Sequence, residues 1–355
     1  MASKYSLDLT ECFSGHIGPC ISTLAWNLSD SMLAVSSTDG DLGVVSIHDS
    51  TWTSLSSTSG LSVDSVGFSD HDSTLMALGA AGQLMIWSPE DLLSDHPPTT
   101  TVQIDATWPD LARWQPGGSL LAVADGKRVR FWDSIRNQWN GEELLMTGTI
   151  LSLVWNPSGT VLAASCQGQL IAWDSQNQTT VECETDSAGL CLDFSSDGYW
   201  LASGQFDRSL ILWNCFGDDQ PRKIAGFPGK IRSIRWNCAL DDDPESFEQL
   251  YVCSSNAMIV WNRTSHDPSE WAPKPIFHHS KRITSLSSSC CHHLVTTSSL
   301  DGRLVFWNRE GQPLKEISFE NQGISIAELS STKNLVAVGG NSGKLKVLTF
   351  KSPDS

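Results

Sequence analysis

Positive charge is scarce in this chain of 355 residues. Lysine and arginine number 23 against 40 aspartates and glutamates, which gives a formal net charge of −17. Proteins that bind nucleic acid or anionic membranes nonspecifically need a basic surface, so this balance argues against both functions. The chain also lacks an apolar run near the roughly 18 residues of a membrane helix, and its first residues contain no apolar signal segment. We therefore expect a soluble, cytoplasmic protein without membrane insertion.

Motifs that carry common enzyme chemistry are absent as well. The sequence contains no GxSxG, HExxH, P-loop or glycine-rich dinucleotide-binding motif. Four aspartates, Asp39, Asp125, Asp207 and Asp301, occupy similar predicted turns, but the repeat described below explains three of them as turn-bracing residues, and Asp125 lies one residue out of register. We therefore expect a protein that is not an enzyme and that needs no cofactor.

No two of the ten cysteines form a CxxC pair. They are scattered along the chain, and several lie inside apolar, alternating stretches. In a domain of this size the pattern is typical of reduced, buried thiols rather than of a disulfide framework.

The chain is rich in a repeated pattern of three short β-strands. The pattern is clearest in residues 189–214, GLCLDFSSDGYWLASGQFDRSLILWN, where alternating apolar residues flank Asp/Gly turns. It recurs about every 40–45 residues, and one copy cannot bury its faces alone, so the copies are expected to stack. The predicted third strands end at eight residues: Val45, Trp87, Trp132, Trp173, Trp213, Trp261, Trp307 and Leu348.

These repeats resemble those of the WD40 β-propeller family over nearly the whole chain. The dipeptide WD occurs at 132–133 and 173–174, Trp-Asn replaces it in three further repeats, and GH at 15–16 matches the family's opening dipeptide. The resemblance implies an all-β propeller of four-stranded blades, which in this family is mostly a non-catalytic platform. Because the repeats are degenerate and no further domain is appended, the chain looks most similar to bacterial single-domain WD-repeat proteins.

The repeats predict eight four-stranded blades in a single domain spanning residues 1–355. Seven blades are the alternative if the third or the sixth blade is malformed. The last repeat ends too near residue 355 to supply its own outer strand, whereas residues 5–13, YSLDLTECF, form an otherwise unused strand. We expect this N-terminal strand to pair with the last blade, since such closure removes exposed sheet edges.

The resemblance also implies a buried hydrogen-bond chain of His, Ser or Thr, Asp and Trp within a blade. Only the seventh repeat is expected to assemble this structural set, from His278 or His279, Ser298, Asp301 and Trp307. Most other blades are expected to rely on packing alone.

Aromatic and cationic residues gather in loops that the propeller places on one face. This top face contains the loops before the first strand and between the second and third strands of each repeat. Such residues are enriched at the centres of protein interfaces, so we predict a protein-binding region around the fifth to seventh blades. Its candidate residues are Trp108, Phe206, Arg208, Phe227, Lys230, Lys281 and Arg282. Charge favours an acidic partner segment there, and a basic one on the opposite face, which carries the acidic insertion at 239–249.

The seventh repeat is also rich in histidine and cysteine, which suggests zinc. The candidate ligands are Cys290, Cys291, His292 and His293. Their spacing is neither CxxC nor HxxxH, adjacent strand residues point apart, and His278 and His279 lie about 20 Å away along a strand. A tight hairpin turn could still gather two or three ligands, but we expect no bound metal.

We therefore expect a non-catalytic scaffold that mediates protein–protein interaction or complex assembly with an unidentified protein partner. Two alternatives remain open: an accessory protein of metal homeostasis with this Cys/His zinc site, and an enzyme that uses the central channel as other propeller families do.

Overall fold

The computed structural model describes an all-β chain. It covers residues 7–57, 60–79, 82–94, 96–104, 111–217, 220–239, 248–263, 271–289, 291, 293–319 and 322–351. Apart from the 3-10 turn η1 (Pro89–Asp91), the regular elements in these ranges are β-strands. No helix among them has the length and apolar character needed to cross a membrane. The chain divides into two compact units: unit 1 is Met1–Asp110 with Ile283–Ser355, and unit 2 is Leu111–Arg282.

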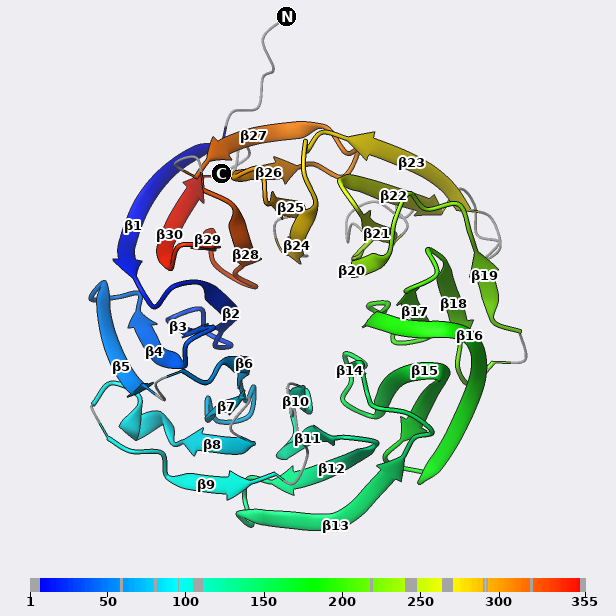
Figure 1. The fold of residues 1–355 in the computed structure, drawn as a ribbon, viewed down its shortest axis with the longest axis horizontal. Coiled ribbons are helices and arrows are strands. Elements are labelled where there is room, and N and C mark those ends of the chain that lie inside the picture. Colours follow the sequence, from blue (N-terminus) through cyan, green and yellow to red (C-terminus); the bar gives the residue numbers. More distant parts are fainter. Residues whose placement is uncertain are drawn as a thin grey trace, which may run out of the picture. The chain divides into compact units, whose positions relative to one another are not determined.

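Unit 1 contains four antiparallel sheets of four strands each (Figure 1). The first two are β2 (Ile21–Trp26), β3 (Met32–Ser37), β4 (Asp41–Ser46) and β5 (Thr51–Ser57), then β6 (Val63–Phe68), β7 (Leu75–Gly79), β8 (Gln83–Trp87) and β9 (Thr100–Gln103). The third is β24 (Ile283–Ser289), β25 (Leu294–Ser299), β26 (Arg303–Trp307) and β27 (Pro313–Ser318). The fourth is β28 (Ile324–Leu329), β29 (Leu335–Gly340), β30 (Lys344–Lys351) and β1 (Asp8–His16).

Unit 2 contains two sheets of four strands and one of six. The four-stranded sheets are β10 (Ala112–Trp114), β11 (Leu120–Asp125), β12 (Arg128–Asp133) and β13 (Gln138–Leu145), and β20 (Ile231–Asn237), β21 (Gln249–Ser254), β22 (Ala257–Arg263) and β23 (Trp271–Phe277). The six-stranded sheet is β14 (Ser152–Trp155), β15 (Val161–Asp174), β16 (Thr179–Phe194), β17 (Trp200–Gln205), β18 (Leu210–Asn214) and β19 (Arg222–Ile224).

The described strands form seven sheets, six of four strands and one of six, rather than the eight separate four-stranded sheets that were predicted. The repeats expected to end at Trp173 and Trp213 share the six-stranded sheet because β16 is continuous. Residues 179–188 of this strand pair with β15, and residues 189–194 pair with β17. The outer strand of one repeat thus runs directly into the first strand of the next. The seven-bladed alternative required a malformed third or sixth blade, but both of these repeats form a complete four-stranded sheet.

The N-terminal strand completes the last sheet, as the sequence predicted. β1 pairs antiparallel with β30 from Asp8↔Lys351 to His16↔Lys344, and Figure 1 shows the two side by side in blue and red. The strand spans Asp8–His16 rather than residues 5–13, of which residues 5 and 6 lie outside the described ranges. A single domain over residues 1–355 stays a prediction.

Neighbouring sheets within a unit are joined through their first strands. The sequence repeats Trp-Asn at the end of such strands, and the indole N–H of this tryptophan donates to a backbone carbonyl of the adjacent first strand. In unit 1, Trp26 Nε1 donates to Glu328 O at 3.2 Å. In unit 2, Trp155 Nε1 donates to Arg113 O, also at 3.2 Å. A repeated sequence signal thus produces a repeated contact between sheets.

Four of the eight free cysteines in the described ranges are buried: Cys166, Cys183, Cys215 and Cys253. Free thiols are found at Cys12, Cys20, Cys166, Cys183, Cys191, Cys215, Cys253 and Cys291. Burial raises the pKa of both Cys191 and Cys215 to about 12, so neither is a thiolate at neutral pH. Cys238 is disulfide-bonded, and the expectation of reduced thiols is wrong at that position.

The tryptophans that end the third strands differ in whether their indole N–H has a partner. Trp307 Nε1 donates to Thr297 Oγ1 at 2.9 Å. Ser298, the predicted partner, faces the other side of the strand because side chains alternate, and its hydroxyl bonds to Thr284 and Ser285. Asp301 braces its turn by accepting the Arg303 N–H at 3.0 Å. The described residues offer no partner to three other buried indole N–H groups, those of Trp87, Trp132 and Trp261.

We expect Thr297→Val to lower the free energy of unfolding by about 1–2 kcal/mol, because it leaves the buried Trp307 N–H without an acceptor at nearly unchanged volume. Thr297→Ser keeps the hydroxyl and should retain most of the stability. Equilibrium urea denaturation measures both variants. An unchanged midpoint for Thr297→Val would refute the role of this bond.

The strand register supplies the reciprocal test. Thr297 lies two residues after Val295, the cross-strand partner of Trp307. Val252 occupies the same position relative to Trp261, because it lies two residues after Leu250, the cross-strand partner of Trp261. Val252→Thr should therefore be neutral or stabilising, because its hydroxyl can accept the unpartnered indole N–H. The matched control is Val338→Thr in the repeat that ends at Leu348, where the buried hydroxyl meets no indole and should cost about 1–3 kcal/mol. Equal losses in the two variants would contradict the interpretation.

Candidate protein-interaction surface

The turn between β17 and β18 presents Phe206 and Arg208 to solvent in a fixed conformation. The Phe206 side chain is 49% exposed, and Arg208 has φ +67. The turn is tied to β16 by two hydrogen bonds: the Phe206 N–H donates to Ala188 O at 2.9 Å, and the Asp207 N–H donates to Ser187 Oγ at 3.1 Å. These contacts fix the backbone of the turn from which both predicted side chains project.

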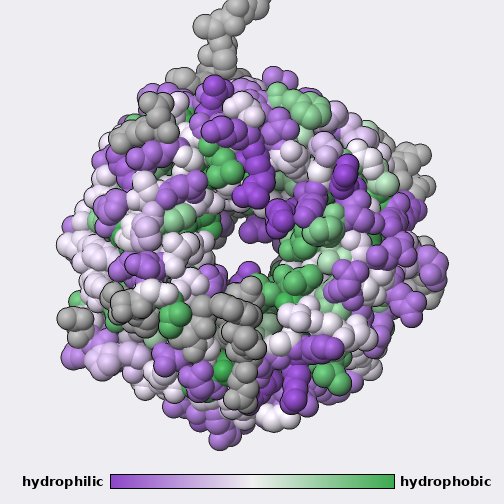
Figure 2. Space-filling model, viewed as in Figure 1, coloured by the Kyte–Doolittle hydropathy of each residue, from purple (hydrophilic) through white to green (hydrophobic). Residues whose placement is uncertain are grey.

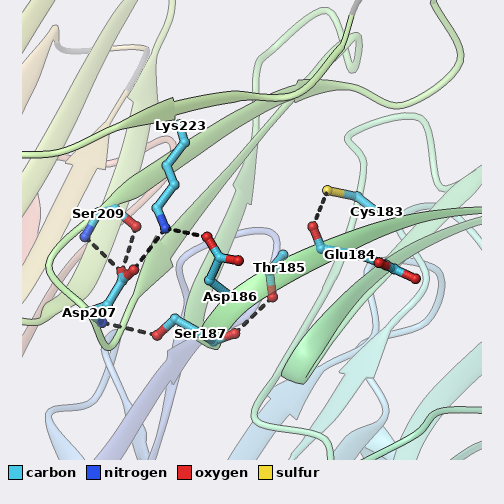
Figure 3. Close-up of polar contacts among 8 residues, drawn as sticks. All are labelled: Cys183, Glu184, Thr185, Asp186, Ser187, Asp207, Ser209 and Lys223. Atoms are coloured by element: carbon cyan, nitrogen blue, oxygen red, sulfur yellow. Dashed lines mark hydrogen bonds and ion pairs between the residues drawn. The ribbon is translucent and has the colours of Figure 1, made fainter.

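Charged groups beneath the turn reinforce it (Figure 3). Lys223 Nζ lies 2.8 Å from Asp186 Oδ2 and 3.0 Å from Asp207 Oδ2, so it joins β16, the β17–β18 turn and β19. Asp207 Oδ1 also accepts bonds from the N–H and the hydroxyl of Ser209. Although burial alone would raise it, the pKa of Asp207 is lowered by Ser209 and Lys223. The pKa of Lys223 is raised by its hydrogen bonds to Asp186 and Asp207, so Lys223 and Asp207 are both charged at neutral pH.

Phe206 and Lys230 are brought together across the sheet. Lys230 Nζ lies 3.6 Å from the centroid of the Phe206 ring, a cation–π contact. The segment before Lys230 is anchored to the β21–β22 turn, because Ser254 Oγ accepts the Gly229 N–H at 2.9 Å and donates to Gly229 O at 2.7 Å. Two predicted binding residues that are 24 positions apart in sequence therefore form one surface feature.

An apolar pocket lies next to this feature. Its volume is about 350 Å³, within the range of ligand-binding pockets. Phe227, another predicted binding residue, is only 7% exposed, and its ring packs 6.3 Å from that of Trp261. The walls come from the β19–β20 connection and from β22 and β23: Ala225, Gly226, Phe227, Pro228, Ile259, Trp261, Pro273, Pro275 and Phe277. Phe277 is 67% exposed.

The sequence did not single out the residues of β22 and β23 that form this pocket. Trp261 is predicted only as the end of a third strand, and no residue of β23 is a predicted binding residue. The signal that could have revealed them is the alternation of proline in WAPKPIF, which is unusual in a strand.

The other predicted site residues are less informative. Lys281 and Arg282 follow β23 and are exposed. Trp108, Cys290 and His292 lie outside the described residues, as do residues 240–247 of the acidic insertion. Cys291 is exposed. Within the described ranges, no three or more His, Cys, Asp or Glu side chains form a group that could hold a metal ion.

Among the described residues on the face that Figure 2 shows, hydrophobic areas, drawn in green, are interspersed with hydrophilic ones. A partner on such a surface would be held by a few local anchors rather than by a broad apolar contact.

Comparison with known proteins supports a WD40-type fold. Four segments match the WD40 family model, described as WD domain, G-beta repeat: residues 7–44, 142–174, 177–214 and 272–308. Among solved structures, Sqt1 from Chaetomium thermophilum has a TM-score of 0.77 at 14% identity, covering 96% of this chain and 99% of that one. The β-propeller domain of Cps50 (Swd1) from Myceliophteria thermophila has a TM-score of 0.65 at 13% identity, with the same coverages.

Curated relatives are distant. SEC12-like protein 2 of Arabidopsis thaliana is 29% identical over 99 residues, 24% of this chain and 25% of the relative. WD repeat and HMG-box DNA-binding protein 1 of Mus musculus is 23% identical over 275 residues, 75% of this chain and 24% of the relative. The chain thus spans about a quarter of the length of these relatives. The relatives found are plant, animal and fungal proteins, so the similarity to bacterial single-domain proteins is not supported.

Proposed function

We propose that this WD40-type β-propeller is a non-catalytic scaffold that binds another protein through one surface of unit 2. This surface, the Phe206–Lys230 surface, comprises the turn at 206–208, the connection at 225–230 and residues 277–282. The observation that carries the proposal is the Lys230 ammonium held over the exposed Phe206 ring beside an apolar pocket. Fixed aromatic and cationic side chains of this kind are enriched where protein interfaces gain most of their affinity.

Two further observations support a scaffold. The burial of Cys191 and Cys215 raises their pKa values, whereas thiol nucleophiles need lowered ones. The relatives carry names of quite different kinds, among them a protein transport protein and a cell cycle switch protein, which fits a fold that serves several assemblies. A cytoplasmic location and a single domain belong to the same proposal.

We expect a defined protein to co-purify with the tagged chain from its native host, and to be lost when Arg208, Lys230 and Arg282 are all changed to Glu. Charge reversal at an interface removes favourable steering and places like charges against the partner. Mass spectrometry of the purified material, together with its metal content, is the measurement.

The matched control changes three other exposed basic residues, Lys127, Arg128 and Lys351, to Glu. The net charge changes equally, so a partner lost from both variants would indicate a nonspecific charge effect. A partner retained by the first variant would show that the Phe206–Lys230 surface is not the binding site. Stoichiometric zinc without any protein partner would favour metal handling over the scaffold.

A further inference from the structure

We propose that the pocket beside Phe277 takes one bulky apolar side chain from an acidic, extended segment of the partner protein. This inference rests on the proposed scaffold function and adds the chemistry of the segment that is bound. We call this cavity the Phe277 pocket; its lining residues are those given above.

The strand register makes the pocket a preformed feature. β22 and β23 pair Ile259 with Pro275 and Trp261 with Pro273, so alternate residues of both strands share the face that lines the cavity. The opposite wall is the 225–228 segment, which is followed by the Gly229 anchor to Ser254. A cavity built on two paired strands and a tethered segment needs little ordering when a side chain enters, which favours affinity.

The prolines of β23 exclude the commonest alternative mode of binding. β23 is the outermost strand of its sheet, and an exposed edge can pair with a strand of another protein. Pro273 and Pro275 lack the N–H groups that such pairing requires. A partner is therefore expected to insert a side chain into the pocket rather than to extend the sheet.

Charge around the pocket selects an acidic segment. Although the chain carries a net charge of −17, residues 220–239 contain five basic residues and no aspartate or glutamate. One of the five, Lys223, is already paired with Asp186 and Asp207. Lys230 faces the Phe206 ring, and the described residues provide no carboxylate partner for Arg208 or Arg282. Carboxylates on either side of an apolar anchor would meet these cations, whereas a basic segment would be repelled.

Three labelled nonapeptides test the proposal by fluorescence anisotropy with the full-length protein. The first has a central tryptophan flanked by four aspartates or glutamates on each side; the second replaces the tryptophan with glycine; the third replaces every acidic residue with serine. We expect the first peptide to bind at least tenfold more tightly than the other two, and its affinity to fall as salt is raised. Equal binding of the glycine peptide, equal binding of the serine peptide, or no binding of the first peptide at about 1 mM would each overturn the proposal.

Substitutions at the Phe277 pocket test whether the first peptide binds there. Ala225→Trp fills the cavity from an exposed position, and Phe277→Ala removes an exposed wall; each should weaken the first peptide at least tenfold without unfolding the protein. Lys230→Glu should weaken binding and make it less dependent on salt. The controls are Ile135→Ala, which truncates a side chain as exposed as Phe277, and Lys351→Glu. Unchanged affinity of Ala225→Trp, or equal losses in the controls, would overturn the pocket assignment.

The co-purified partner separates this inference from the scaffold proposal. If a partner is retained by Ala225→Trp but lost on reversal of Arg208, Lys230 and Arg282, the scaffold stands and the pocket inference fails. If no defined protein co-purifies, the scaffold proposal fails whatever the peptides do.

Discussion

Replacing Asp30 with alanine is expected to lower the free energy of unfolding by about 2–4 kcal/mol. Asp30 is fully buried, and its Oδ2 accepts the Thr332 N–H at 2.5 Å, the Thr332 hydroxyl at 2.7 Å and the Lys333 N–H at 3.0 Å. Oδ1 accepts the Ser331 N–H at 3.3 Å. Alanine would remove the acceptor of all four donors at once; Ser331, Thr332 and Lys333 are themselves exposed, so water replaces part of these bonds and the loss stays below the sum of four hydrogen bonds.

The loss should be large because these bonds join turns at opposite ends of the sequence. Asp30 lies in the β2–β3 turn, and residues 331–333 form the β28–β29 turn, both within unit 1. One carboxylate therefore fixes two sheets to each other in the part of the chain where the N-terminal and C-terminal strands meet. Asp30 also has φ +49, a backbone conformation that alanine adopts less readily than aspartate or asparagine does.

Two further substitutions separate the bonds from the backbone strain. Asp30→Gly relieves the strain but still removes the acceptor, so it should recover only a small part of the loss. Asp30→Asn keeps one acceptor oxygen and tolerates positive φ, and it should fall between wild type and alanine. Urea denaturation of the three variants, with the exposed Asp64→Ala as control, gives the comparison. A loss below about 1 kcal/mol for Asp30→Ala would refute the argument.

The fold could be predicted where it depends on local pattern, and could not where it depends on contacts between repeats. Alternating apolar residues and turn residues were enough to locate the strands that end near Trp132 and Trp307. The N-terminal strand, which no repeat used, pairs with β30 as predicted. The continuity of β16 was not predicted, because the repeat that ends at Trp213 was expected to begin at residue 189. In the structure the stretch before residue 189 is held by the ion pair between Asp186 and Lys223, which only the folded sheet supplies, and by a local hydrogen bond from the Thr185 hydroxyl to Ser187 O.

The candidate site shows the same division. Phe206 and Arg208 share one short turn, so the sequence alone placed them together. The contact between Lys230 and Phe206 depends on the path of the β19–β20 connection, which no local pattern determines. The pocket was missed for a different reason: the sequence singles out Phe227, but the cavity that this residue lines is completed by β22 and β23.

The sequence did not identify Asp193 as a special residue either. We expect its ionisation to make the folded protein less stable as pH rises. It lies on β16, where Oδ2 accepts the Trp236 N–H at 2.8 Å and the backbone carbonyl accepts the Trp236 indole N–H at 3.2 Å. Burial raises the pKa of Asp193 to about 6, although Arg235 and the Trp236 N–H lower it in part. The unfolded chain has a pKa of about 3.9 at this residue, so between these values the folded state binds more protons. The contribution of Asp193 to the free energy of unfolding is therefore fully present below about pH 3.9 and is lost as pH rises through about 6.

We expect Asp193→Asn to exceed wild type in free energy of unfolding by about 2–3 kcal/mol at pH 7.5, and to match it near pH 4. The asparagine oxygen can still accept the Trp236 N–H, so the substitution removes the charge and keeps the bond. Urea denaturation between pH 4 and 7.5 measures the difference between the two proteins, in which the effects of the other titrating groups cancel. Asp207→Asn is the control of opposite sign: the lowered pKa of Asp207 stabilises the fold above about pH 3.9, so this variant should lose stability at neutral pH. A difference between Asp193→Asn and wild type that does not change with pH would show that the carboxyl group of Asp193 ionises as freely in the folded protein as in the unfolded chain.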